Sequence, residues 1–297
     1  MAAFKRIFLF MVVNLLVIVT ITIVTTLLGV PGYMSAQGLN YTTLLVFCVA
    51  WGMGGAFISL ALSRMMAKWM LGVQVIDANV GDAALRDLVA RVHRLARAAG
   101  IDRMPEVGIY QSAEVNAFAT GPTKNRSLVA VSSGLLGSMS SDQVDGVLGH
   151  EIAHVANGDM VTMTLVQGIV NAFVMFFARV VAFFVSTMVR EQLAWIVRFV
   201  VTIALEIAFS FLGMLVVAAF SRWREYRADA GGARLAGREK MIGALRALQG
   251  LSNRIDPNAA PALQSLKISS KPAGLMALFA THPPLAERIR RLERSHT

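Results

Sequence analysis

The sequence predicts an α+β membrane protein that is mostly helical. We expect about four transmembrane helices in two hairpins, and one polar domain with a small β-sheet that the second hairpin splits. Three observations predict this class. Of the 297 residues, 56% are apolar and only 15% are charged, whereas soluble domains carry about 25% charged residues. The apolar residues gather in long runs. The polar residues form two stretches, one on each side of the second apolar block.

Two apolar runs predict the first transmembrane hairpin, within residues 1–70. Residues 7–28 and 39–62 each exceed the roughly 18 apolar residues that cross a bilayer as a helix. The first run is too long for the core of a signal peptide, so we interpret it as a retained anchor. Basic residues lie before the first run and after the second, namely Lys5, Arg6, Arg64 and Lys68. The positive-inside rule therefore places both ends of this hairpin in the cytoplasm.

Residues 160–220 predict the second hairpin, although charged residues interrupt the apolar block. At 1.5 Å per residue, Arg179 lies about 26 Å along a span that starts near Thr162, and Glu206 lies about 21 Å back from Phe220. Ionisable residues at such depth are costly unless they are paired or face a wet interior. We therefore expect Arg179 and Glu206 to pair. The alternative is that Arg179 reaches the far headgroups while Glu206 faces a cavity.

The polar domain is expected to consist of residues 71–159 and 221–297. Apolar residues at helical spacing predict helices over residues 82–99, 141–155 and 284–292. Alternating patterns predict strands over residues 106–111, 114–120 and 127–132, with a turn marked by Gly121-Pro122 and Lys124-Asn125. Residues 253–274 are interpreted as a loop, with a flap over the site as the alternative.

Charge and cysteine content exclude other classes. The net charge of +10 is interpreted as membrane topology. A nucleic-acid binder is disfavoured, because no basic stretch interleaves with aromatic residues on the polar domain. The single cysteine, Cys48, excludes an intrachain disulfide, and its apolar surroundings indicate a small hydrophobic side chain rather than a reactive thiol.

The segment His150-Glu151-Ile152-Ala153-His154 predicts a metal site. Positions four apart share one face of a helix, so both imidazoles can reach one ion. Zinc favours such ligands, and a catalytic zinc keeps one position open for water. Glu151 would then be the general base of a hydrolase. By chance alone, a chain of this composition would contain the pattern roughly once in 400 cases. Two surface histidines are the alternative; an intramembrane protease is disfavoured by the polar flanks of this helix.

A third metal ligand is expected from the second polar stretch, because residues 155–165 contain no histidine. Glu225 and Asp229 are spaced four apart and so face the same way on a helix. We expect Glu225 to bind the metal and Asp229 to orient a ligand histidine through its free ring N–H. The alternative is an exposed helical turn whose carboxylates pair with Arg222, Arg224 and Arg227.

Four motifs make the chain resemble the HtpX family of bacterial membrane-bound zinc endopeptidases, which is related to the CAAX prenyl proteases. They are residues 150–154, residues 224–229, residues 116–121 (Asn-Ala-Phe-Ala-Thr-Gly) and residues 281–284 (Thr-His-Pro-Pro). The resemblance implies a zincin-like metalloprotease domain with one Zn²⁺ per chain, held by the histidines and Glu225. It further implies that Asn116 and Ala117 hold the substrate backbone at an edge strand, and that His282 stabilises the oxyanion.

The expected function is hydrolysis of peptide bonds at the cytoplasmic surface of the bacterial inner membrane. Both metal-binding segments lie within a few turns of an apolar block, which favours membrane-associated substrates. The resemblance implies degradation of misfolded or damaged membrane proteins, with unfolded polypeptides and the lipid bilayer as partners and no nucleic acid. The protease domain and both termini would face the cytoplasm. The alternatives are a CAAX-type processing protease, an aminopeptidase, and a non-catalytic membrane scaffold with a structural zinc.

Overall fold

The computed structural model describes residues 41–77, 81–254 and 278–295. The predicted first span (residues 7–28) and nearly all of the predicted loop (residues 253–274) lie outside these ranges. The chain divides into two compact units, one of Met1–Ser59 with Met163–Val217 and one of Leu60–Thr162 with Ala218–Thr297. We describe each unit by itself.

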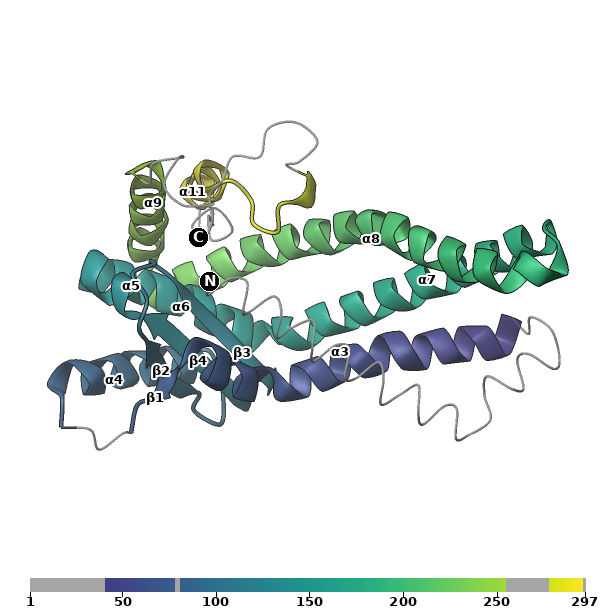
Figure 1. Cartoon of the computed structure of the whole chain (residues 1–297). Helices are drawn as coiled ribbons and strands as arrows, with labels where there is room; N and C mark the ends of the chain where they lie inside the picture. Colours follow the sequence, from purple (N-terminus) through teal and green to yellow (C-terminus); the bar gives the residue numbers. More distant parts are fainter. Residues whose placement is uncertain (1–40, 78–80, 255–277, 296–297) are drawn as a thin grey trace. The chain divides into compact units, whose positions relative to one another are not determined.

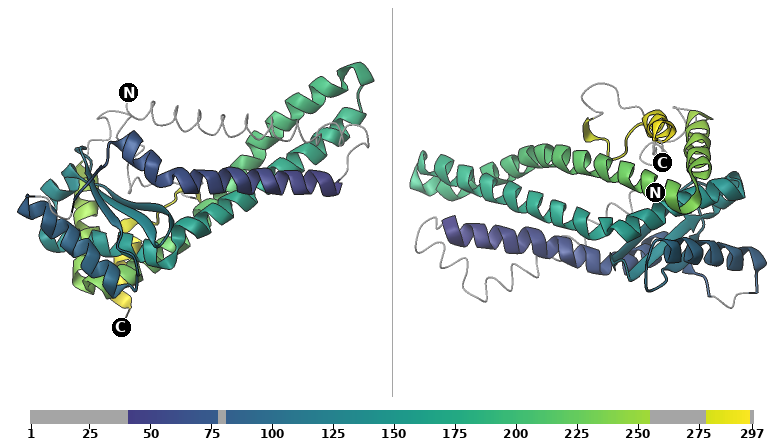
Figure 2. Two further views of the ribbon diagram at one scale, coloured as in Figure 1. Left: turned by 90° about the horizontal axis from the view of Figure 1, so that it is seen from below. Right: turned by 180° about the vertical axis from the view of Figure 1, so that it is seen from behind.

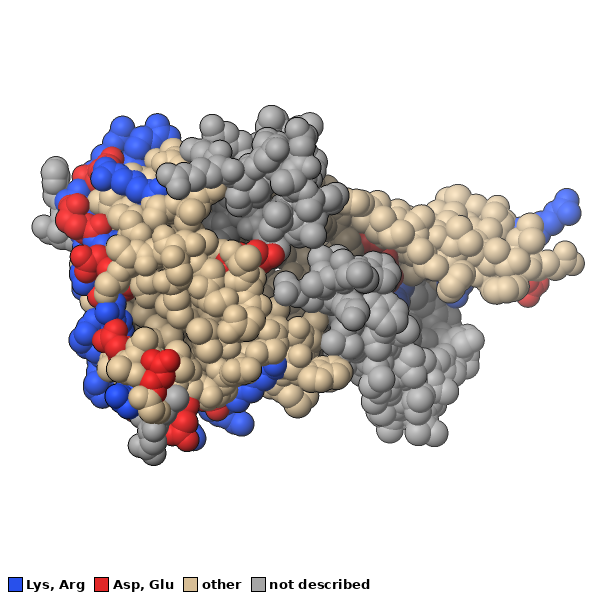
Figure 3. All heavy atoms as spheres, turned by 60° about the vertical axis from the view of Figure 1, so that its left-hand side comes forward, with Lys and Arg blue, Asp and Glu red and all other residues tan. Residues whose placement is uncertain are grey.

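Three long helices dominate the structure: α3 (Tyr41–Leu71), α7 (Asp159–Thr187) and α8 (Glu191–Ala236) (Figure 1). Each is long and apolar enough to cross a membrane, and they are the three such helices in the described part of the chain. They correspond to the second, third and fourth predicted spans. On the face that Figure 3 shows, the visible surface of the projecting apolar helices is mostly uncharged except at its far end, as contact with lipid tails requires.

Small residues bring the apolar helices of the first unit together. A Cβ added at Gly52 of α3 would lie 2.8 Å from the carbonyl oxygen of Gly168 in α7. Such small-residue contacts let membrane helices approach closely. Between α7 and α8, Arg179 donates a hydrogen bond of 2.5 Å to Glu206. The predicted ion pair is therefore present, and the alternative in which Arg179 reaches separately toward the far headgroups is wrong.

The second unit holds a four-stranded sheet with the order β1-β2-β4-β3 among the described residues. The strands are β1 (Gln74–Val75), β2 (Glu106–Tyr110), β3 (Ala117–Thr123) and β4 (Arg126–Ser132). β2 and β4 are parallel, whereas β1 and β3 run antiparallel to their neighbours. The two-residue strand β1 was not predicted, since its pattern is too short to show alternation.

The turn between β3 and β4 is shorter than predicted. Gly121 and Pro122 continue strand β3, and only Lys124 and Asn125 form the turn. The register shifts between Thr120 and Thr123, which marks a bulge. Gly121 has a φ of 146°, and an added Cβ would meet the Arg126 carbonyl oxygen at 2.2 Å. The Gly-Pro pair therefore indicates a bulge here rather than the end of the strand.

Both faces of the sheet are covered within the second unit (Figure 2). On one face, Val129 and Val131 of β4 pack against α4 (Ala83–Ala98) and α6 (Ser141–Asn157). On the other, Leu128 and Ala130 pack near the end of α3. The remaining helices are α5 (Ser133–Ser138), α9 (Arg238–Arg254) and α11 (Leu285–Arg294). Helix α9 packs against both α6 and α11.

Candidate metal centre

Helix α6 positions two histidines on one face. It begins at a capping box, in which Ser140 accepts from the backbone N–H of Gln143 and the Gln143 side chain accepts from that of Ser140. It ends at Gly158, whose φ of 68° is left-handed. His150 and His154 are one turn apart, both are buried, and their Nε2 atoms lie 3.1 Å from each other.

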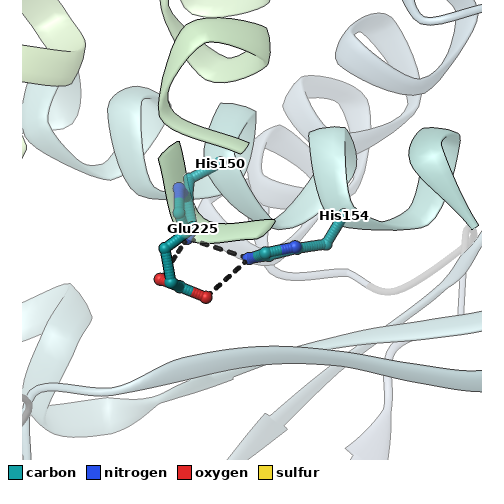
Figure 4. Close-up of side chains that lie close together, drawn as sticks. All are labelled: His150, His154 and Glu225. Carbon is teal, nitrogen blue, oxygen red and sulfur yellow. Dashed lines mark hydrogen bonds and ion pairs between the residues drawn. The ribbon is translucent and has the colours of Figure 1, made fainter. Parts of the chain in front are cut away.

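Helix α8 brings a carboxylate to these imidazoles. Glu225 is 1% exposed, and its two oxygens lie 3.4 Å from His150 Nε2 and 3.3 Å from His154 Nε2. Figure 4 shows the three side chains converging from two helices. One ligand atom of each lies within 4.8 Å of the others, and no other such group occurs in the described part of the chain. Two imidazoles and a carboxylate are a donor set that zinc prefers, so the residues fit a divalent metal.

A second layer of carboxylates orients the histidines. Asp229 Oδ1 lies 3.0 Å from His150 Nδ1, and Asp159 Oδ2 lies 2.6 Å from His154 Nδ1. Each histidine can therefore donate its Nδ1–H to a carboxylate and direct its Nε2 toward Glu225. Such partners fix the tautomer and the ring orientation of metal-binding histidines.

Arg288 of α11 completes this layer. Its guanidinium donates two hydrogen bonds to Asp229, at 2.8 and 2.6 Å, and lies 3.6 Å from Glu225 Oε2. The side chain is buried. Because the arginine neutralises a buried carboxylate, Asp229 can stay ionised beside His150.

The pKa values show that the site stabilises positive charge between the imidazoles. Burial by itself would lower the pKa of His150, but hydrogen bonds to Asp229 and Glu225 outweigh it and raise the pKa to about 9. Burial opposes the ionised form of Asp229, yet Arg288 lowers its pKa to about 2. Against the same opposition, three histidines hold the pKa of Glu225 far below its usual range. The same carboxylates favour a bound cation between the imidazoles, because opposite charges attract at short distance.

The cluster opens into a cavity of about 440 Å³. Glu151 is partly exposed and lines this cavity beside the two histidines. His282 also lines it, with Nδ1 2.9 Å from Glu225 Oε2. The structure thus brings Glu151 and His282 to the same space as the three potential ligands.

Strand β3 forms one wall of the cavity. Asn116, which precedes the strand, and Ala117, its first residue, both line the cavity. Among the residues that the structure describes, β3 pairs with β4 on one side only, because it is the last strand in the sheet order. Its other edge has no strand partner within the same residues, which suits the addition of an extended peptide.

Comparison with known proteins identifies the family. Residues 83–296 match the model of the family described as "Peptidase family M48". The chain belongs to peptidase family M48.

Full-length relatives agree with this assignment. A "Protease HtpX homolog" of Bacillus licheniformis is 56% identical, over 97% of this chain and 99% of its own length. One of Bacillus subtilis is 55% identical with the same coverage, and a "Protease HtpX" of Thioalkalivibrio sulfidiphilus is 50% identical over 97% of this chain and 98% of its own. The crystal structure of S. mikatae Ste24p has a TM-score of 0.63 at 17% identity and covers 97% of this chain and 67% of that one. The fold is therefore shared with Ste24p.

These findings make the protein a membrane-bound metallopeptidase of the M48 family. A non-catalytic scaffold is set aside as the function, because the family is one of peptidases. The chain carries a possible metal-binding triad and helices that suit an integral membrane protein.

Sequence reasoning missed two residues of the site. Asp159 follows His154 by five positions, which is a spacing that could have identified it as a partner. Arg288 lies among Leu285, Ile289 and Leu292, the residues that define the buried face of α11. A charged residue on an otherwise apolar helix face was the available signal, because buried arginines need a partner.

Proposed function

We propose that this M48 protein is a zinc endopeptidase that cleaves membrane-protein or unfolded polypeptide substrates at the cytoplasmic surface of the bacterial inner membrane. The observation that carries the proposal is the buried His150, His154 and Glu225 triad, which shares a cavity with the carboxylate of Glu151. A structural metal site has no use for a carboxylate beside the ligands, whereas a hydrolase needs one as general base.

The proposed roles follow from this geometry. His150, His154 and Glu225 would hold the zinc, and Asp229 would orient His150. When bound, zinc supplies Lewis acidity that activates water and polarises the scissile carbonyl. Glu151 would take the proton of the attacking water and pass it to the leaving amine.

Substrate binding is proposed at the wall of the cavity that strand β3 forms. Asn116 and Ala117 would hold the substrate backbone at the free edge of β3, which lines the same cavity. His282 would donate a hydrogen bond to the oxyanion that develops on the scissile carbonyl, as its partly exposed ring in the cavity permits.

The proposed domain division is a hairpin over residues 1–70, a first protease part over 71–159, a second hairpin over 160–220 and a second protease part over 221–297. The two compact units of the structure support a division of this kind. His154 lies five residues before α7 begins, and Glu225 lies five residues beyond Phe220 in α8. Catalysis near the bilayer surface would follow from these short spacings. A role in the quality control of membrane proteins would follow instead from the similarity to HtpX proteases.

The test is a comparison of wild type and Glu151→Gln, both purified in detergent. We expect one zinc per chain in both, and a kcat for casein that is about 10²–10⁴-fold lower in the variant, the usual contribution of a general base. Glu239→Gln, at an exposed position of α9, is the matched control and should cleave as wild type does. Cleavage by Glu151→Gln at the wild-type rate would falsify the mechanism. Cleavage of a prenylated C-terminal peptide, without cleavage of casein, would instead indicate a CAAX-type processing protease.

A further inference from the structure

A second polar pocket lies away from the metal centre, at the end of α3. It has a volume of about 520 Å³ and is lined by Arg64, Arg103, Met104, Glu106, Asn125, Arg126 and Ser127. None of these residues lines the cavity of the metal centre. All of them belong to the second compact unit. The proposed peptidase mechanism does not use this pocket.

The pocket carries more positive than negative charge. Glu106 is shared by two cations, Arg64 and Lys68, and the Lys68 Nζ lies 2.7 Å from its Oε2. Burial opposes its ionisation, but these two cations hold the pKa of Glu106 below its usual value. Arg103 and Arg126 are exposed and form no ion pair with any residue that the structure describes. The shared carboxylate therefore leaves a surplus of cations.

Unused hydrogen-bonding groups indicate the chemistry of a ligand. The Arg64 Nε–H is buried and finds no acceptor among the described residues. Together with two unpaired guanidiniums, it offers donors that an oxyanion with several oxygens, such as a phosphate, can accept. The Asn125 Oδ1 is buried as well and receives no hydrogen bond within the same ranges, while its Nδ2 donates to Asp102 at 3.5 Å. A hydroxyl group beside the phosphate would supply the missing donor.

The position of the pocket along α3 indicates where that phosphate comes from. The apolar run of this helix ends at Leu62, so Arg64 follows it by about 3 Å along the helix axis. Met65 and Trp69, one turn apart, are 61% and 73% exposed. Tryptophan is enriched at the headgroup level of membranes. The basic pocket therefore coincides with the transition from lipid tails to headgroups along this helix.

We propose that this pocket binds the phosphate group of an anionic phospholipid, with the guanidiniums of Arg64, Arg103 and Arg126 as donors. A lipid held there would secure the second unit to the membrane surface. A free phosphate anion shares the same chemistry, so the experiment separates the two sources.

The test measures phospholipid binding to the full-length protein in detergent micelles by native mass spectrometry. Phosphatidylglycerol is the probe, because it joins a phosphate to a hydroxyl-bearing headgroup without a balancing cation. Phosphatidylcholine and inorganic phosphate are the comparison ligands. We expect saturable binding of phosphatidylglycerol, and weaker binding of phosphatidylcholine because its choline cation meets the surplus arginines.

The decisive variant is Arg103→Gln/Arg126→Gln, which removes two exposed cations that form no ion pair with a described residue. We expect its affinity for phosphatidylglycerol to fall about 10- to 100-fold, in line with the loss of two charge-assisted contacts. Arg103→Lys/Arg126→Lys should retain part of the affinity. Arg97→Gln/Arg234→Gln, with the same change of charge at exposed positions outside the pocket, should bind as wild type does. Casein cleavage should be unchanged in all of them and reports correct folding.

Two results would overturn the proposal. In one, the pocket variant and the control variant bind phosphatidylglycerol equally, which would make the attraction a property of overall charge. In the other, millimolar inorganic phosphate binds to wild type and displaces phosphatidylglycerol, while the affinity for phosphatidylglycerol is the same with and without the arginines. The site would then be one for a free anion.

Discussion

Arg288 offers the sharpest test of how the metal centre is held together. This arginine lies on α11, is 3% exposed and donates two hydrogen bonds to Asp229. Asp229 in turn contacts His150 Nδ1. The substitution Arg288→Met keeps much of the buried volume but leaves the carboxylate of Asp229 buried without its arginine partner. We expect this change to weaken both the fold and the metal site.

The magnitude follows from the burial of the pair. Removing one partner of a buried ion pair costs about 3–5 kcal/mol. For a domain of this size each kcal/mol lowers the unfolding midpoint by about 2–4 °C, so Arg288→Met should lower it by about 10 °C. Loss of a group that orients a metal-binding histidine typically weakens metal affinity about 10- to 100-fold, and the same is expected for zinc here.

The assay is thermal unfolding in detergent, measured with and without zinc, together with a zinc competition titration. Asp229→Asn/Arg288→Met removes both charges and keeps an acceptor for His150, so it should recover part of the lost stability. Arg290→Met is the matched control, since Arg290 is exposed on the same helix and should leave the midpoint unchanged. An unchanged midpoint in Arg288→Met, or a double variant less stable than the single one, would refute the argument from a buried ion pair.

Three further outcomes are expected. Reversal of Arg179 or Glu206 alone should destabilise the protein in the membrane, and the double swap should restore stability in a thermal unfolding assay; a double swap worse than either single one would contradict the pairing. Asp159→Asn keeps an acceptor for His154 but loses the charge, so the zinc affinity should fall about 10- to 100-fold in a competition titration, and an unchanged affinity would contradict the orienting role. Ionised Asp229 has a folded pKa of about 2, below the ordinary value of 3.8. Its contribution of about 2 kcal/mol to the stability of the metal-free protein is therefore present above pH 4 and disappears as the pH falls toward 2. Unfolding midpoints measured from pH 5 to pH 2 test this. The same pH profile in Asp229→Asn would contradict the assignment to Asp229.

Local patterns were sufficient wherever one helix carries the information. His150 and His154 share a face because a helix repeats every 3.6 residues, and the structure places their Nε2 atoms side by side. The same reasoning placed Glu225 and Asp229 on one face of a helix. The depth of Arg179 and Glu206 along two antiparallel spans was enough to predict their contact, because the rise per residue is constant.

Contacts between distant segments could not be derived in this way. The sequence does not say that α11 returns to the metal centre, so the role of Arg288, 138 positions after His150, became visible only in the fold. The predicted turn after β3 is correct at Lys124 and Asn125 but too long at Gly121 and Pro122, because a bulge and a turn both favour glycine. The order β1-β2-β4-β3, which leaves β3 at the edge, depends on pairings between strands.

The sequence by itself predicted the three long apolar helices that the structure describes, the two motifs that carry the candidate metal ligands and the peptidase class, because each depends on periodicity or spacing within one segment. The tertiary structure decided which distant groups meet: Glu225 with the two histidines, Arg288 with Asp229, and the free edge of β3 with the cavity. The physical reason is that a helix defines its own faces through local hydrogen bonds. Which face meets which partner depends on the packing of the whole domain.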